Sequence, residues 1–145
     1  MFFTSRDLTK SCLILIYHYF LQGTIIGLIE STFPLKLKEN NFSFSEIGIY
    51  MLCKYPFSLK LLWAPMVDTY YFTWLGLRKT WIIGSQIVCA IVLLVLVSYY
   101  ESLIKERNIY ILSLIAILAI FSIASQDIAV DALALKIIDK QVNKL

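Results

Sequence analysis

Charged residues are scarce in this chain of 145 residues. Asp, Glu, Lys and Arg make up only 16% of it, whereas 59% of the residues are hydrophobic. Soluble domains carry about 25% charged residues, so the composition argues against a soluble protein. The net charge of +3 is small and the basic residues are scattered, which excludes the basic patch expected of a nucleic-acid partner. Composition therefore indicates a protein that is embedded in lipid.

Motifs for metal binding, redox chemistry and catalysis are also absent from the sequence. The three cysteines, Cys12, Cys53 and Cys89, are far apart and lie in apolar stretches, and the only histidine is His18. No CxxC pair and no Cys/His spacing typical of zinc occurs. We therefore expect no metal and no cofactor, and we interpret the cysteines as small apolar packing residues.

Four long apolar runs fill most of the chain. A helix needs about 20 apolar residues to cross a hydrocarbon core, and each run approaches that length. The sequence predicts an all-α integral membrane protein that forms a single domain over residues 1–145. Its four antiparallel transmembrane helices would cover about residues 11–33, 44–67, 80–100 and 109–130.

Prolines and caps predict where these helices end or bend. Pro34 is expected to end the first helix and Pro56 to bend the second, because proline removes a backbone donor and clashes with the preceding turn. Ser43 or Ser45 can cap the second helix, with Glu46 in its first turn.

The distribution of Lys and Arg predicts the orientation in the membrane. With a cytoplasmic N-terminus, seven of these residues fall on the cytoplasmic side and four on the other, which favours this orientation. The cytoplasmic seven are Arg6, Lys10, Arg78, Lys79, Lys136, Lys140 and Lys144.

A group of charged residues is predicted at the cytoplasmic ends of the helices. Asp68 follows the second helix, and Arg78 and Lys79 begin the third, so opposite charges can pair across a short connector. Asp127 and Asp131 are four residues apart and share one helical face, where Arg78 or Lys79 could lie between them. We predict one cytoplasmic charge cluster of these five residues; the alternative is that the aspartates lie in headgroup water.

Four polar residues inside the apolar runs are candidates for a substrate path. His18 and Gln22 lie one turn apart in the first run, Lys60 lies in the second, and Gln126 lies in the fourth. Polar groups are costly in lipid and usually face a bundle interior or an aqueous cavity. Lys60 could contact phosphate groups of a ligand, or it could snorkel to the headgroups.

Three separated motifs point to one protein family. The stretch Tyr55–Pro65 followed by Asp68 is the most specific, and Leu21–Gly23 and Ser125–Asp131 occur in the matching order. The connector Gly76–Lys79 resembles the loop motif of the major facilitator superfamily. Together they resemble the acetyl-coenzyme A transporter family of that superfamily, relatives of bacterial muropeptide permeases, over almost the whole chain.

The resemblance implies a transporter of twelve helices that moves acetyl-coenzyme A from the cytosol into the lumen of the endoplasmic reticulum by alternating access. This chain would supply the first third of that fold, an incomplete N-terminal half. Alternating access needs two bundles around a central site, so the implied partners are the remaining transporter helices, besides the lipid bilayer and acetyl-coenzyme A.

Two other functions stay open at this point. The chain could be a small structural or accessory protein with four spans, or part of a related permease for another anionic solute. A membrane enzyme that combines His18 with an aspartate is disfavoured, because His18 is expected near the middle of its helix and Asp127 near a helix end.

Overall fold

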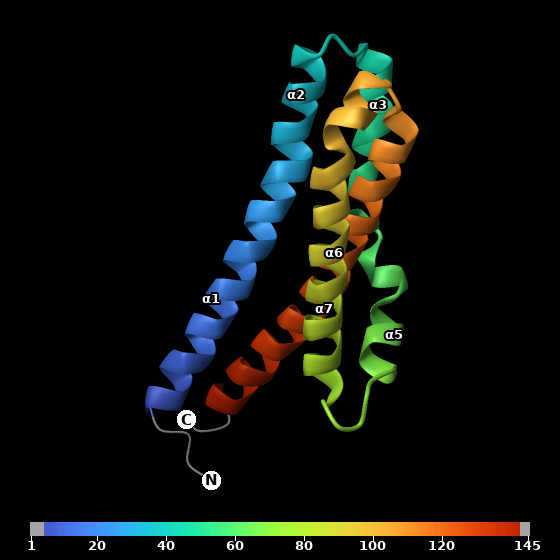
Figure 1. Cartoon of the computed structure of the whole chain (residues 1–145). Helices are drawn as coiled ribbons and strands as arrows, with labels where there is room; N and C mark the ends of the chain where they lie inside the picture. The colour runs from blue at the N-terminus through green and yellow to red at the C-terminus, as the bar shows by residue number, and fades with distance from the viewer. Residues whose placement is uncertain (1–4, 143–145) are drawn as a thin grey trace.

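The computed structural model describes residues 5–142, and every regular element in this range is helical. Three long helical segments and one broken segment run alongside one another (Figure 1). The first comprises α1 (Ser5–Gly27), η1 (Leu28–Thr32) and α2 (Phe33–Glu39). The broken segment comprises α3 (Phe44–Tyr50), η2 (Met51–Lys54), α4 (Tyr55–Ser58), η3 (Lys60–Leu62) and α5 (Ala64–Thr69). The other two are α6 (Leu77–Lys105) and α7 (Ile109–Val142).

Within the described range, three helices are long and apolar enough to cross a membrane. They cover Thr9–Glu39, Leu77–Lys105 and Ile109–Asp139. This agrees with the predicted class of helical integral membrane protein. Helix α7 continues to Val142, well beyond the predicted end near residue 130. The broken segment that corresponds to the predicted span 44–67 contains no long helix, so a fourth crossing stays a prediction.

Pro34 and Pro56 do not act as the sequence suggested. The first helical segment continues beyond Pro34 to Glu39. The second segment is not one bent helix around Pro56 but a series of short helices. Each proline, Pro65 included, lies in the first turn of a new short helix, where its missing N–H breaks no hydrogen bond within that helix. Non-α turns precede all three, so the chain adjusts its hydrogen-bond register before each proline.

Pro34 is accommodated by a π-helical turn and by a side chain from another element. The π register is seen in the bond from Phe33 N–H to the carbonyl of Leu28. In the same register residue 34 would donate to the carbonyl of Ile29, and proline has no N–H to do so. The hydroxyl of buried Tyr50 donates to that carbonyl instead, at 3.0 Å. The first helical segment therefore continues beyond Pro34, and the carbonyl of Ile29 still accepts a hydrogen bond.

Helix α7 forms the centre of the molecule. It contacts α1, α6 and the pieces of the broken segment, and 61% of its apolar stretch is buried, against 11% for the first helix. Small side chains such as Ala116 and Ala119 allow neighbouring helices to approach closely. Residues on α7 are therefore the ones that the other segments can reach.

The ends of the elements bring candidate residues together. The start of α1, the end of α7 and the connector from α5 to α6 all lie at one end of the molecule (Figure 1). At the other end Ser43 caps α3 with Glu46 in a reciprocal capping box, which confirms the predicted cap. Which end faces the cytoplasm stays a prediction.

Candidate functional site

A partly buried ion cluster joins three segments of the bundle. The Lys60 ammonium in η3 contacts Asp127 Oδ2 on α7 and lies 3.4 Å from Asp131 Oδ2. The hydroxyl of Tyr19, on α1, donates to Asp131 Oδ1 at 2.7 Å. Lys60 also lies over the ring of Phe57, with its nitrogen 5.1 Å from the ring centroid. We call Tyr19, Lys60, Asp127 and Asp131 the ion cluster.

The ion cluster corrects the predicted partner of the two aspartates. Asp127 and Asp131 share a face of α7 as expected, but the cation between them is Lys60 rather than Arg78 or Lys79. The reason is that η3 packs directly on α7 and directs Lys60 at that face. The Lys60 ammonium is held by the two aspartates, and its depth relative to the headgroups stays a prediction.

Asp68 and Arg78 form a separate ion pair. Arg78 Nη1 donates to Asp68 Oδ1 at 2.6 Å across the connector between α5 and α6. Lys79, the next residue of α6, is exposed. The predicted single cytoplasmic cluster is thus divided into two sites, because Arg78 is already engaged by the aspartate of its own connector while Lys60 occupies the face of α7.

A small cavity lies between α1, α6 and α7. Its volume is about 230 Å³, and three glutamines line it together with mainly apolar side chains. Gln22 and Gln126, both predicted for the substrate path, are buried on opposite helices of this cavity, and Gln86 is half-buried on α6. Among the described residues Gln22 Nε2 has no hydrogen-bond partner. We call this cavity the glutamine pocket.

His18 and Lys54 make contacts that the sequence did not reveal. The Nδ1–H of His18 donates to the carbonyl of Ile14 in its own helix at 2.7 Å, which is a local packing role. Lys54 Nζ lies 3.2 Å from Glu30 Oε2 and so links η2 to the π-helical turn. Neither residue belongs to the ion cluster.

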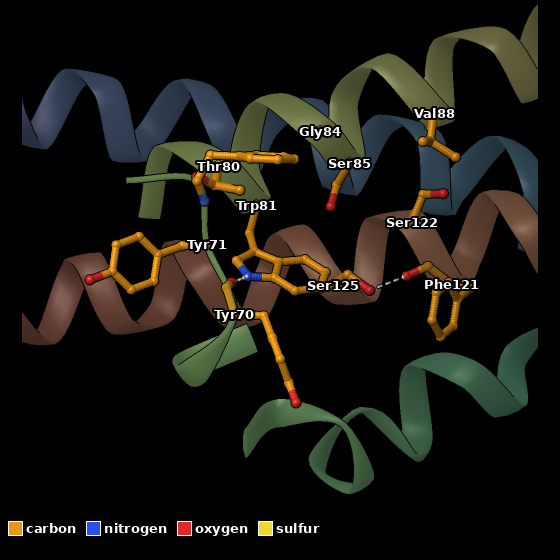
Figure 2. A pocket seen from close by; sticks show the side chains of 11 residues that line it. Tyr70, Tyr71, Thr80, Trp81, Gly84, Ser85, Val88, Phe121, Ser122 and Ser125 are labelled. Atoms are coloured by element: carbon orange, nitrogen blue, oxygen red, sulfur yellow. Dashed lines mark hydrogen bonds between the residues drawn. The ribbon is translucent and has the colours of Figure 1, made fainter. Parts of the chain in front are cut away.

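An apolar groove lies beside the ion pair of the connector. Its volume is about 510 Å³, and Figure 2 shows Trp81 within it, with the indole nitrogen donating to the carbonyl of Tyr70 at 2.7 Å. On the α7 side, Ser125 donates to the carbonyl of Phe121 and accepts from the indole of Trp63. These bonds hold the broken segment and its connector against α6 and α7.

Comparisons with known proteins show to which family this sequence is similar. The family model described as acetyl-coenzyme A transporter 1 matches residues 11–145. The chain belongs to this family. An uncharacterized protein of Schizosaccharomyces pombe is 38% identical over 129 residues, covering 88% of this chain and 25% of the relative.

More distant relatives include a named permease. An uncharacterized membrane protein of Saccharomyces cerevisiae is 34% identical, over 88% of this chain and 26% of its own length. The anhydromuropeptide permease of Escherichia coli K12 is 28% identical, over 78% of this chain and 22% of its own length. The chain thus spans about a quarter of the length of these relatives, and no solved structure matches it.

Proposed function

We propose that the complete protein transports acetyl-coenzyme A from the cytosol into the lumen of the endoplasmic reticulum by alternating access. Membership of the acetyl-coenzyme A transporter family supports this substrate. In this proposal the chain forms the first four helices of a twelve-helix major-facilitator fold, and the broken segment from Phe44 to Thr69 is the second crossing. The remaining helices of the transporter would complete the cavity around the substrate.

The ion cluster is the observation on which the transport mechanism rests. Charged side chains inside apolar helices are costly and usually mark a functional path. This cluster connects the broken segment to α7 through Lys60 and connects α1 to α7 through Tyr19. Such a contact can form in one conformation of a transporter and break in another. It can therefore shift the equilibrium between the two conformations.

We propose that Lys60 exchanges its partners during transport. Here one ammonium faces the two carboxylates of Asp127 and Asp131, so these three groups carry a net charge of 1 − 2 = −1. A phosphate group of acetyl-coenzyme A would be repelled by this cluster unless Lys60 turned away from an aspartate towards it. Lys60 would then be a substrate contact in one state and an interhelical contact in the other.

Uptake by the complete protein in liposomes tests this proposal. The change Lys60→Gln should raise the KM for labelled acetyl-coenzyme A, while Lys60→Arg should retain more activity because the charge stays. Lys54→Gln is the matched control, since it removes a lysine of the same segment that pairs with Glu30. Uptake kinetics of Lys60→Gln equal to those of the control, in equal amounts of inserted protein, would remove Lys60 from the substrate path.

A permease for another anionic solute is the second candidate. It is supported by the similarity to the anhydromuropeptide permease of Escherichia coli. Competition decides between the two: unlabelled acetyl-coenzyme A should suppress uptake of its labelled form at far lower concentration than an anhydromuropeptide does. The reverse order would favour the second candidate. Fractionation of cells that express a tagged protein tests the proposed endoplasmic reticulum location.

A further inference from the structure

The glutamine pocket contains one buried amide nitrogen, Nε2 of Gln22, that has no hydrogen-bond partner among the described residues. Only 4% of Gln22 is exposed, its Nε2 lacks a partner among residues 5–142, and it lines a cavity in an apolar helix bundle. A buried amide without a partner destabilises a protein, and more so where lipid replaces water. An apolar residue at this position would avoid that cost. The geometry therefore calls for a hydrogen-bond acceptor that enters the pocket.

The composition of the pocket restricts what that acceptor can be. Gln22, Gln86 and Gln126 each offer a neutral carboxamide, which donates through N–H and accepts through its carbonyl. The other lining residues include Tyr17, Cys89 and several aliphatic side chains, and none of the lining residues is charged. A neutral ligand with both donor and acceptor groups, such as an amide, matches this set better than a phosphate does.

The size of the pocket agrees with a short arm rather than a nucleotide. Its volume of about 230 Å³ corresponds to roughly eight water molecules at about 30 Å³ each. Gln126 directly precedes Asp127, so the pocket and the ion cluster are adjacent along α7. A ligand that reached both would place its neutral arm in the pocket and its charged part near Lys60.

We propose that the glutamine pocket binds the amide and acyl carbonyl groups of the transported substrate. This proposal rests on the proposed function, and it names the part of the substrate that the pocket recognises. In coenzyme A this part is the pantetheine arm, which has two amides and, when acetylated, a thioester carbonyl. An anhydromuropeptide also carries amides, so the same pocket serves either candidate substrate.

Native Cys89 provides a direct probe, because it lines the pocket and is almost fully buried. In the complete protein with Cys12, Cys53 and any further cysteines replaced by Ser, the rate of Cys89 modification by a methanethiosulfonate reagent is measured. Millimolar S-methylpantetheine, which keeps both amides and has no free thiol to consume the reagent, should slow this reaction at least fivefold, whereas 3′-phosphoadenosine 5′-diphosphate, the nucleotide half without the arm, should not. A variant that retains only exposed Cys12 should be unaffected by either compound.

Gln22→Met separates ligand binding from packing. Methionine has a similar shape and no polar group, so the Tm of the variant should equal or exceed that of wild type. At the same time S-methylpantetheine should lose its protection of Cys89, and the KM for acetyl-coenzyme A should rise about tenfold. A lower Tm with unchanged KM would instead show that Gln22 is a packing residue bonded to another part of the protein, and it would overturn the proposal.

The two proposals fail in different ways. If S-methylpantetheine protects Cys89 in a protein that does not transport acetyl-coenzyme A, the pocket proposal stands and the proposed substrate is refuted. If the protein takes up acetyl-coenzyme A, S-methylpantetheine gives no protection and Gln22→Met leaves the KM unchanged, the pocket proposal alone is refuted. If Cys89 does not react with the reagent, the KM and Tm of Gln22→Met decide the question.

Discussion

The contact between Lys60 and Asp127 should be a strong interhelical coupling, and its strength can be worked out from burial. The Lys60 side chain is 25% exposed and that of Asp127 is 10% exposed, so the pair is neither fully buried nor in open water. Breaking a buried pair costs about 3–5 kcal/mol, whereas exposed pairs contribute about 0.2–1 kcal/mol. We expect a coupling free energy of about 2 kcal/mol, between these limits.

A double-mutant cycle measures this coupling. Lys60→Gln, Asp127→Asn and the double variant of the complete protein are unfolded with SDS in mixed micelles. Each single change leaves one charge without its main partner, so each should lower the free energy of unfolding. The double variant should lose less than the sum of the two single changes, by about 2 kcal/mol.

The pair of Lys54 with Glu30 is the control for this cycle. Its side chains are 45% and 22% exposed, so the same cycle there should give a coupling below about 1 kcal/mol. Additive losses for Lys60 and Asp127 would refute the reasoning, because they would mean that the two charges do not stabilise one another. A coupling equal to that of the control would refute the argument from burial.

Three further outcomes are expected. Tyr50→Phe removes the donor to the Ile29 carbonyl and should lower the free energy of unfolding by about 1–3 kcal/mol in the same SDS assay. A loss below about 0.5 kcal/mol, which is the usual effect of a surface substitution, would contradict this role of the hydroxyl. Asp68→Asn and Arg78→Gln should each reduce uptake, and the double variant should lose less than their sum; strict additivity would count against a shared function. A cysteine placed at Lys38 should be modified from the lumenal side, and modification from the cytosol alone would reverse the predicted orientation.

Length and composition were enough to predict the regular helices. Apolar runs of about 20 residues gave the positions of α6 and of the first part of α7, because burial in lipid requires a continuous apolar stretch. Ser43 and Glu46 were predicted from a local pattern that needs no tertiary information. Such features depend on residues close in the sequence, which explains why they could be predicted.

Contacts between distant residues could not be predicted in the same way. Tyr19 and Asp131 are 112 positions apart, and nothing in the sequence near Tyr19 distinguishes it from the other tyrosines. The partner of Asp127 depends on the direction in which η3 presents Lys60. The sequence predicted only a bend at Pro56, whereas the structure divides this segment into short helices and 3₁₀ turns. The ion cluster therefore required the structure.

The irregular second segment and the ion cluster depend on one another. The broken segment changes between α-helical and 3₁₀ turns, and η2, α4 and η3 all pack on α7. Two side-chain contacts fix this packing, since Lys60 contacts Asp127 and the indole of Trp63 donates to Ser125. The residues Ser125 and Asp127 on α7 thus stabilise the broken segment, and this segment in turn directs Lys60 at α7. A regular helix in this segment would present Lys60 in another direction, so we infer that the breaks themselves are part of the functional site.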